Sequence, residues 1–287
     1  MKTTKEPEFF SKQVTQARRF FMENTAAGGR RIKVVSGGCE QTQPGFKIDR
    51  KDFPYFSLEF VAKGRGTAVL SGRKYDLIPG TIFSYGGQIS QIITADPQHA
   101  MTKYFINFVG GDARQMPRKL AAPAGTAVQV SRPDEIIRIF DDLISQGLSD
   151  SPYKSAICSV LLEYLFYKIA QTKVTDHTRP IRALVTYQTC RQHIKENFIT
   201  LNSLQEIADS CAIDRAYLCR LFKRFDTQSP YHYLMSLKMT TAAERLHGPD
   251  VLVKEIAFEL GFEDPFHFSR AFKKVFGVSP QTFKKLR

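Results

Sequence analysis

The stretch ELGFEDPFHFSRAFKKVFGVSP, residues 259–280, decides how the C-terminal part of this chain is interpreted. It begins with a helical pattern, breaks at Gly261, resumes after Asp264 and Pro265, and continues as an aromatic and basic segment to Gly277. Glycine after a helix, and aspartate followed by proline before one, are typical helix-end signals. The stretch therefore predicts a short helix, a tight turn and a second, basic helix.

The same pattern occurs once more, earlier in the chain. The segment EIADSCAIDRAYLCRLFKRFDTQSP (206–230) aligns with EIAFELGFEDPFHFSRAFKKVFGVSP (255–280), with one residue inserted in the second turn. Self-similarity of this kind indicates two structurally equivalent units. The identical pairs are Glu206/Glu255, Ile207/Ile256, Ala208/Ala257, Arg220/Arg270, Phe222/Phe272, Lys223/Lys273, Ser229/Ser279 and Pro230/Pro280.

Each copy has the form of a helix-turn-helix. A small alanine lets the two helices approach closely, and Ala212-Ile213 or Gly261-Phe262 makes the turn. The second helix places apolar residues on one face at helical spacing, which predicts a core face. These residues are Leu218, Leu221, Phe222 and Phe225 in the first copy, and Phe268, Ala271, Phe272 and Phe276 in the second, with Phe262 also in the core.

The opposite face of each second helix is mostly basic. A helix of this width fits the major groove of B-DNA, where the base edges can be told apart. We therefore expect double-stranded DNA as a partner. The candidate DNA-binding residues are Arg215, Ala216, Cys219, Arg220 and Lys223 in the first copy, and Asp264, Pro265, His267, Arg270, Lys273 and Lys274 in the second.

Three of these residues have a structural alternative. Arg220 and Arg270 could form salt bridges inside the domain, for example with Glu206 or Glu255, instead of contacting DNA. His267 could cap or pack rather than contact DNA. Lys284, Lys285 and Arg287 are better interpreted as a solvated tail than as residues that read bases.

Residues from about 185 to 287 resemble the C-terminal domain of the AraC/XylS family of bacterial transcriptional regulators. The second copy follows the signature of that family closely, whereas the first departs at Asp226, where glycine is usual, and the linking segment at Lys238, where arginine is usual. Aspartate can adopt the glycine-like backbone conformation at a cost. The departures therefore affect the detail of one turn and leave the predicted fold unchanged.

The resemblance implies that a linking helix over residues 231–246 holds the two units rigidly. Sixteen residues span about 24 Å at roughly 1.5 Å per residue. That length is compatible with recognition helices in successive major grooves on one face of DNA, about 34 Å apart. The resemblance also implies RNA polymerase as a partner and activation as the common mode.

The N-terminal half has a different pattern. Between residues 53 and 109, short apolar segments alternate with glycine turns, which favours an antiparallel sandwich or barrel. The segments are YFSLEFV, TAVL, KYDLI, TIFSY and KYFINFV. The stretch YDLIPGTIFSY (75–85) resembles the strand-turn-strand of the cupin-like effector domains of the same family. Residues 1–52 are basic and turn-rich (AAGGRR, SGGCEQTQPG), with little clear period.

Two helices are predicted after the strands. SRPDEIIRIFDDLISQG begins at a Ser131 cap and ends at Gly147, and SPYKSAICSVLLEYLFYKIAQ begins at residues 151–152. The second helix either covers the barrel or forms a dimer interface. In the resembled family the corresponding helices mediate dimerisation or contact the DNA-binding domain. We predict an α+β chain with an N-terminal cupin-like β-barrel with helices (1–174, effector-binding and dimerisation), a linker (175–184), and an all-α domain with two helix-turn-helix units (185–287).

Aromatic and basic residues of the predicted strands are candidates for binding a small-molecule effector. A small barrel is either hollow or packed solid, so a filled core is the alternative. The candidate effector-binding residues are Phe56, Arg65, Phe83, Tyr85, Lys103, Tyr104 and Phe108.

Composition restricts the class of protein. The 287 residues carry a net charge of +13, which favours a polyanionic partner, but residues 1–180 hold more of this excess than residues 181–287. No apolar run is long enough to span a membrane, and the polar N-terminus lacks a signal peptide, so we expect a cytoplasmic, nucleoid-associated protein. Five cysteines without a C-x-x-C pair favour free thiols, and the spacing of Cys211 and Cys219 fits no metal ligand set.

An enzyme is the main competing interpretation, since a cupin-like barrel can hold a catalytic metal. That chemistry needs clustered histidines and carboxylates, and the predicted barrel has only His99. An architectural DNA binder without an effector is a third interpretation, and it would discriminate little between base sequences. We expect a sequence-specific DNA-binding regulator of transcription without cofactor or metal, whose N-terminal domain senses a small molecule or forms a homodimer. Activation is what the resemblance implies, and repression is the alternative.

Overall fold

The computed structural model describes residues 7, 9–22, 31–113, 115–120, 122–174, 181–246, 248 and 251–285. The chain separates into two compact units, Met1–Thr175 and Asp176–Arg287. Helix α4 already begins at Ile181, so the last four residues of the expected linker 175–184 are helical. The other six residues of the expected linker, 175–180, lie outside the described residues. The first of them, Thr175, is the last residue of the first unit.

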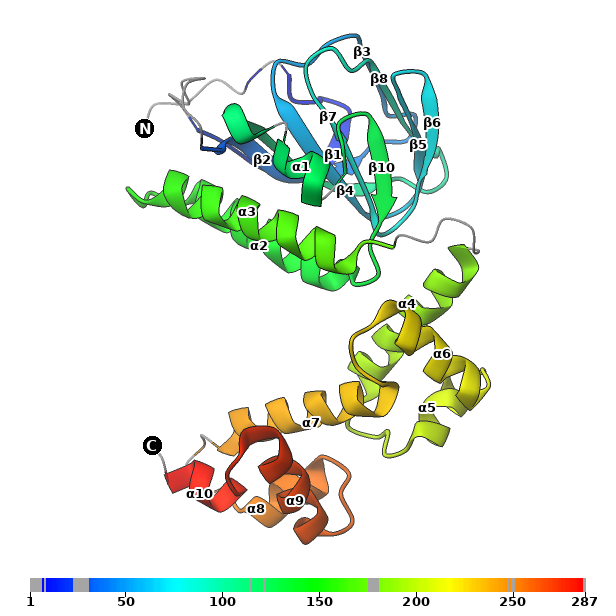
Figure 1. Ribbon diagram of the computed structural model, residues 1–287, viewed down its shortest axis with the longest axis vertical. Coiled ribbons are helices and arrows are strands. Elements are labelled where there is room, and N and C mark those ends of the chain that lie inside the picture. Colours follow the sequence, from blue (N-terminus) through cyan, green and yellow to red (C-terminus); the bar gives the residue numbers. More distant parts are fainter. Residues whose placement is uncertain are drawn as a thin grey trace. The chain divides into compact units, whose positions relative to one another are not determined.

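The first unit is a sandwich of two antiparallel sheets (Figure 1). The six-stranded sheet has the order β1-β2-β9-β4-β7-β10 and the four-stranded sheet the order β3-β8-β5-β6. The strands of the larger sheet are β1 (Val14–Phe21), β2 (Lys33–Thr42), β4 (Phe56–Lys63), β7 (Thr81–Tyr85), β9 (Thr102–Val109) and β10 (Thr126–Gln129). Those of the smaller are β3 (Lys47–Arg50), β5 (Gly66–Leu70), β6 (Arg73–Leu77) and β8 (Gln91–Ala95).

The predicted α+β fold class is confirmed, with one correction to the barrel. Among the described residues the two sheets share no hydrogen-bonded strand edge, so they form a cupin-like sandwich rather than a closed cylinder. The five predicted strands correspond to β4, β5, β6, β7 and β9. An apolar cluster that includes Phe46, Leu70, Phe83 and Ile93 fills the space between the sheets.

Strands β1, β2 and β3 lie within residues 1–52, where the sequence shows no clear period. The SGG segment of β2 looks like a turn in the sequence but is extended in the structure. Its glycines are needed because neighbouring atoms leave no room for a side chain. A Cβ atom on Gly37 would lie 2.7 Å from a side-chain carbon of Ile106, and one on Gly38 would lie 2.7 Å from the carbonyl oxygen of Arg18. Glycine inside a strand marks such close approaches as well as turns.

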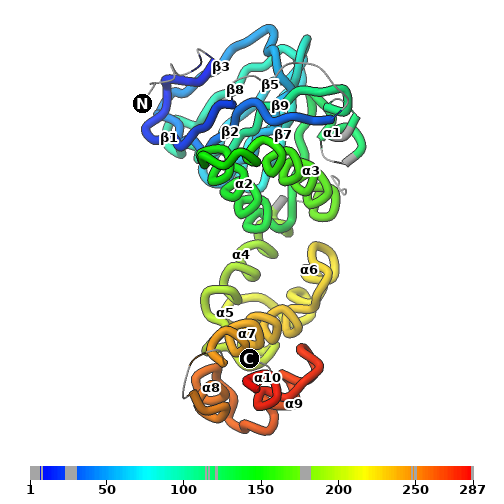
Figure 2. Tube along the Cα trace, turned by 90° about the vertical axis from the view of Figure 1, so that its left-hand side faces the viewer, coloured from blue at the N-terminus to red at the C-terminus, as the bar shows by residue number. Residues whose placement is uncertain are grey.

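Helices α2 (Pro133–Leu148) and α3 (Lys154–Thr172) cover the outer face of the larger sheet (Figure 2). A 3₁₀ turn, η1 (Gly111–Ala113), and α1 (Gln115–Leu120) precede them. The predicted cap of α2 is one residue early, since Arg132 holds the N-cap position. Ser131 donates its backbone N–H to the Thr172 carbonyl (2.8 Å) and so belongs to the bridge that joins the ends of β10 and α3.

The second unit is all helical, as predicted. Its helices are α4 (Ile181–Asn197), α5 (Leu204–Ser210), α6 (Arg215–Phe225), α7 (Pro230–Leu246), α8 (Val253–Glu259), α9 (Pro265–Phe276) and α10 (Pro280–Lys285). The α5–α6 and α8–α9 pairs are the two predicted helix-turn-helix units, and α7 is the predicted linking helix. No described helix has the length and apolar character that crossing a membrane requires.

The two turns are built alike. Ala212 and Gly261 both have positive φ, 53° and 77°. The next residue in each turn donates its backbone N–H to the small alanine of the preceding helix, from Ile213 to Ala208 (3.1 Å) and from Phe262 to Ala257 (2.9 Å). The first turn places an alanine in a conformation that glycine adopts more easily, and the shared hydrogen bonds hold it there.

Asp226 does not adopt the glycine-like conformation that the family pattern suggests. Gly277 follows α9 with φ 79°, whereas Asp226 follows α6 in an extended conformation, φ −127° and ψ 165°. Its carboxylate accepts hydrogen bonds from the Tyr187 hydroxyl (2.5 Å) and the Thr227 backbone N–H (2.7 Å), and pairs with Arg191 (3.3 Å). The aspartate therefore ends α6 by anchoring the next loop to α4.

Candidate nucleic-acid interface and ligand pocket

The first candidate reading helix is α6. Asp214 caps it by accepting the Tyr217 backbone N–H (2.9 Å), and the four predicted core residues of this helix are buried. Of the predicted DNA-binding residues, Arg215, Ala216, Arg220 and Lys223 are exposed and Cys219 is half-buried. The fold thus presents their side chains together on the face opposite the core.

The second candidate reading helix is α9. Asp264 accepts the backbone N–H groups of Phe266 (2.8 Å) and His267 (3.0 Å). Its carboxylate also lies 3.7 Å from the guanidinium of Arg270. Asp264 is therefore the cap that starts the helix and orients Arg270, rather than a group that itself favours the approach of a phosphate.

The remaining candidates of α9 lie on its outer face. His267, Arg270, Lys273 and Lys274 are exposed, and Pro265 is half-buried at the first helical position. The His267 ring also lies edge-on to the Phe262 ring, with centroids 5.6 Å apart. The predicted core residues of this copy pack in one cluster, with Phe262, Phe268 and Phe272 buried and Ala271 and Phe276 partly buried.

The two glutamates proposed as alternative partners of the arginines cap helices instead. The Glu206 carboxylate accepts the Asn202 backbone N–H (2.8 Å), and that of Glu255 accepts the Leu252 backbone N–H (3.2 Å). Arg220 lies over the Tyr217 ring, 5.6 Å from its centroid. Among the described residues neither arginine pairs with Glu206 or Glu255, but Arg270 does form a salt bridge inside the domain, with Asp264 (3.7 Å).

Lys238 on α7 connects the two helix-turn-helix units of the C-terminal unit. Its ammonium group is buried and donates to the Leu260 carbonyl (2.7 Å), at the turn between α8 and α9, and to Asn202 Oδ1 (2.7 Å), just before α5. A third acceptor, the Ile199 carbonyl, lies 3.5 Å away. Burial lowers the pKa of Lys238 to about 8, against a smaller opposing effect of the Glu206 carboxylate.

The thiols of Cys211 and Cys190 are free and form a hydrogen bond with each other. A hydrogen bond from the Cys190 thiol lowers the pKa of Cys211 to about 7, and the same contact, with burial, raises the pKa of Cys190. The two thiols lie on α4 and at the C-terminal end of α5. In the described part of the chain, no three His, Cys, Asp or Glu residues gather to hold a metal ion.

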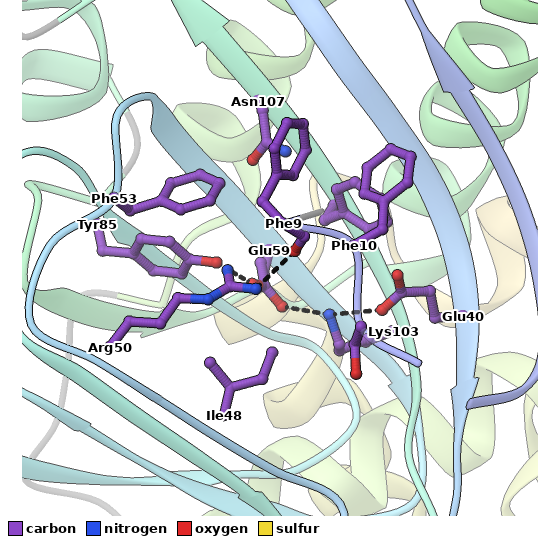
Figure 3. A pocket seen from close by; sticks show the side chains of 12 residues that line it. Phe9, Phe10, Glu40, Ile48, Arg50, Phe53, Glu59, Tyr85, Lys103 and Asn107 are labelled. Atoms are coloured by element: carbon purple, nitrogen blue, oxygen red, sulfur yellow. Dashed lines mark hydrogen bonds and ion pairs between the residues drawn. The ribbon is translucent and has the colours of Figure 1, made fainter. Parts of the chain in front are cut away.

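A pocket of mixed apolar and charged lining opens in the first unit, with a charged network at its base (Figure 3). The buried Lys103 ammonium pairs with Glu40 and with Glu59, both at 2.9 Å. Tyr85 donates its hydroxyl proton to Glu59, and Arg19 pairs with Glu40 (2.8 Å). Burial alone would lower the pKa of Lys103, but the two carboxylates outweigh it and raise that pKa above its usual range.

Residues 9–11 form part of the wall of this pocket. Phe9, Phe10 and Ser11 are among its lining residues (Figure 3). Arg50 donates to the Phe9 carbonyl (2.5 Å) and Arg19 to the Ser11 carbonyl (2.6 Å). The remaining cavity is about 20 Å³, which is room for about one water molecule.

Of the seven predicted effector residues, only Tyr85 and Lys103 line the pocket. Phe56, Tyr104 and Phe108 lie in the cluster under the helices, on the opposite face of the sheet. Phe83 is packed between the sheets without lining the pocket, and Arg65 lies on the surface paired with Asp96 (2.8 Å).

Strand alternation explains why these residues do not lie together. Successive side chains of a strand point to opposite faces, so Tyr104 and Phe108 of β9 cannot share the face of Lys103. Sequence reasoning missed the pocket residues Phe9, Phe10, Ser11, Glu40, Ile48, Arg50, Phe53, Glu59, Phe105 and Asn107. The available signal was the spacing of Lys103, Phe105 and Asn107, together with a glutamate inside the apolar segment YFSLEFV.

Comparison with known proteins covers both units. Residues 34–166 match the model of the AraC-like ligand binding domain, and residues 207–286 match a helix-turn-helix domain. The Msm operon regulatory protein of Streptococcus mutans is 22% identical over 88% of this chain and 92% of its own length. The lactose operon transcription activator of Staphylococcus xylosus is 23% identical over 86% and 90%.

A third relative matches over a shorter range. The raffinose operon transcriptional regulatory protein RafR of Pediococcus pentosaceus is 27% identical over 48% of this chain and 50% of its own length. The two matched domains stand in the order in which the sandwich and the paired helix-turn-helix units occur in the structure. The chain belongs to the AraC/XylS family and is a DNA-binding transcriptional regulator with a domain for a small-molecule ligand.

Proposed function

We propose that this protein activates transcription by reading DNA with α6 and α9. The carrying observation is that two helices built on the same turn both expose cationic residues away from the core. The DNA-binding domain begins with α4 at Ile181 and extends to residue 287, and residues 1–174 form the effector-binding and dimerisation domain. The protein acts in the cytoplasm, at the nucleoid, without catalysis of its own, and RNA polymerase is its partner by family resemblance.

The pocket suits a polyhydroxylated ligand such as a sugar. Paired carboxylates and cations offer hydrogen bonds to hydroxyl groups, and the rings of Phe53 and Tyr85 offer apolar faces. Since the free cavity is small, a sugar enters only when Phe9 and Phe10 leave. The names of two relatives, which refer to the lactose and raffinose operons, support this class of effector.

Selection of genomic DNA fragments by the purified full-length protein tests the function. Performed with and without lactose, raffinose and related sugars, it should recover a common sequence and show a sugar-dependent change in recovery. If about six phosphates are neutralised, log K should fall with log salt at a slope of roughly −5. Equal recovery of all fragments would instead support an architectural DNA binder.

Arg270→Ala and Lys274→Ala should separate base reading from phosphate binding. An arginine can donate two parallel hydrogen bonds to guanine O6 and N7, which no other base presents together. Lys274, one turn later, is better placed for phosphates, which carry no base identity. Arg270→Ala should cost about 1–3 kcal/mol on the selected site and little on random DNA, while Lys274→Ala should weaken both and reduce the salt slope by about one.

Binding titrations on specific and random duplexes at two salt concentrations make the comparison. Both side chains are exposed, so both variants should keep the wild-type circular dichroism spectrum. If Arg270→Ala weakens both duplexes equally, Arg270 is a phosphate clamp or only the partner of Asp264, and the base-reading role assigned to it is wrong.

Helix α3 supports the homodimer. Its inner face buries Leu162, Leu165 and Phe166, as the covering role predicts. Its outer face carries an exposed apolar stripe with alternating spacings of four and three residues, which is the spacing of a coiled-coil seam. The residues of this stripe are Tyr153, Ile157, Val160, Tyr164 and Tyr167. We propose that α3 packs against α3 of a second copy.

Val160→Lys should separate the dimer. Val160 stands at the centre of the stripe and is 66% exposed in one copy. In a two-fold interface each substitution occurs twice, so the dissociation constant should rise about tenfold or more. Sedimentation velocity measures it, with Ser155→Lys as a control, because Ser155 is exposed on the same helix outside the stripe. An unchanged association constant for Val160→Lys would exclude α3 as the interface.

A further inference from the structure

Phe266 is the most exposed large apolar side chain in the described part of the chain, at 76% of its surface. It occupies the first turn of α9 and does not belong to the core cluster that holds Phe262, Phe268 and Phe272. Single exposed apolar residues are common on protein surfaces. Its neighbours give this one a specific meaning.

Phe266, Arg270 and Lys273 form one line along α9. Their spacing of four and then three residues places them on the same helical face, and all three are exposed. The first turn of a recognition helix is the part that contacts base edges in the major groove. The line therefore runs from an apolar ring at that turn, through a guanidinium, to an ammonium.

Thymine is the base that offers an apolar group in the major groove, its C5 methyl, and phenylalanine is one of the side chains that contact it. We infer that Phe266 reads the C5 methyl group of a thymine close to the base that Arg270 reads. This inference rests on the proposed reading of DNA by α9. It also distinguishes the two units, because the equivalent residue of α6 is Ala216, whose methyl reaches less far.

Exposed cations follow the ring along α9, and the exposed carboxylates of Glu263 and Asp264 precede it. The cationic part of this surface matches the major groove better than it matches an apolar protein groove. Besides Arg270 and Lys273, the exposed groups on α9 include His267 and Lys274. A helix surface of this charge attracts the phosphates that flank the groove, so that binding buries the ring against a base edge.

Deoxyuridine tests the inference, because it differs from thymidine only by the missing methyl group. In the sequence selected by the full-length protein, each thymine is replaced singly by deoxyuridine, and the dissociation constant is measured. At one or two positions the wild-type protein should bind about fivefold to tenfold more weakly. The Phe266→Ala protein should bind the two duplexes equally, within about twofold, while Phe266→Leu, which keeps an apolar side chain, should retain part of the difference.

Val275→Ala is the matched control, because Val275 is also exposed on α9 but lies outside this line. It should respond to deoxyuridine as the wild type does. Equal sensitivity of Phe266→Ala and wild type, or no sensitive thymine in the selected sequence, would overturn the inference. So would Phe266→Ala protein that binds DNA normally but fails in transcription, since Phe266 would then contact another protein. Failure to select any preferred sequence would count against the proposed function itself.

Discussion

Lys103→Met should lower the free energy of unfolding of the N-terminal unit by about 3–5 kcal/mol, because it leaves buried carboxylates without their cation. Lys103 is the shared partner of Glu40 and Glu59, at 2.9 Å from each. In the variant, Glu40 still has Arg19 as a cationic partner. For Glu59, the Tyr85 hydroxyl is the one partner that remains among the interactions found for the described residues. The larger part of the loss should therefore come from Glu59.

Urea unfolding followed by hydrogen exchange of β4 and β9 peptides measures this loss separately from the C-terminal unit. Lys63→Met is the control, since Lys63 is exposed at the end of β4 and should change stability by less than about 0.5 kcal/mol. Adding Glu59→Gln to Lys103→Met removes the uncompensated charge and should restore part of the stability. No recovery in this double variant would contradict the assignment of the loss to Glu59.

The pH dependence has a definite sign. The folded pKa of Lys103 is raised above the ordinary value of 10.5, so the folded state binds the proton more tightly than the unfolded chain. The stability from this group is thus fully present below pH 10.5 and is lost as the pH rises through the folded pKa. The difference between the wild type and Lys103→Met should be constant from about pH 7 to 9 and shrink above pH 10.5.

Most helices and both turns of the C-terminal unit could be predicted from sequence; the conformation of Asp226 and the start of α4 could not. The pattern occurs twice, so the structure assigned to each copy can be checked against the other. Phe222 and Phe272 stand at equivalent core positions, and their helices end where the sequence indicates. Local signals sufficed there, because caps, turns and helical spacing are properties of short segments. The exposed positions followed from the same spacing, while their contacts with DNA remain predictions.

The pocket could not be predicted in this way, because its residues meet only through the sheets. Glu40, Glu59 and Lys103 come from three strands, β2, β4 and β9, which are neighbours in an order that the sequence does not display. Phe9 and Phe10 come from a segment without any periodic pattern, which is held by hydrogen bonds from Arg50 to the Phe9 carbonyl and from Arg19 to the Ser11 carbonyl. Strand order and long-range hydrogen bonds are tertiary properties, so periodicity alone leaves them undetermined.

Lys238 illustrates how a departure from the family pattern can have a physical consequence that sequence does not reveal. A buried lysine must leave water, and its charged form is stabilised here by three oxygen acceptors, from Leu260, Asn202 and Ile199. An arginine at this position would remain charged at every accessible pH. The lysine can release its proton, and burial favours that release, so stability should depend on pH.

Between pH 8 and 10.5 the C-terminal unit should become more stable as the pH rises. The folded pKa of Lys238 is about 8 and the ordinary value is 10.5, so in this window the unfolded chain binds more protons than the folded one. Stability then increases with pH, by at most about 3.4 kcal/mol, at 1.36 kcal/mol per pKa unit over about 2.5 units. Below pH 8 both states hold the proton and the contribution is constant.

Thiols and tyrosines titrate in the same pH range. Comparing the pH dependence of stability in the wild type with that in Lys238 variants separates the contribution of this lysine from theirs. Hydrogen exchange of α7 and α8 peptides in the full-length protein, measured across the window, should show the increase in the wild type and in Lys254→Met, whose lysine is exposed on α8. Lys238→Met and Lys238→Arg should both lack it, the first because no amine remains and the second because the guanidinium stays protonated. The same increase in Lys238→Met would mean that another group causes it. Because Lys238 connects the Leu260 turn to the loop that holds Asn202, its protonation would also act on this contact between the two helix-turn-helix units.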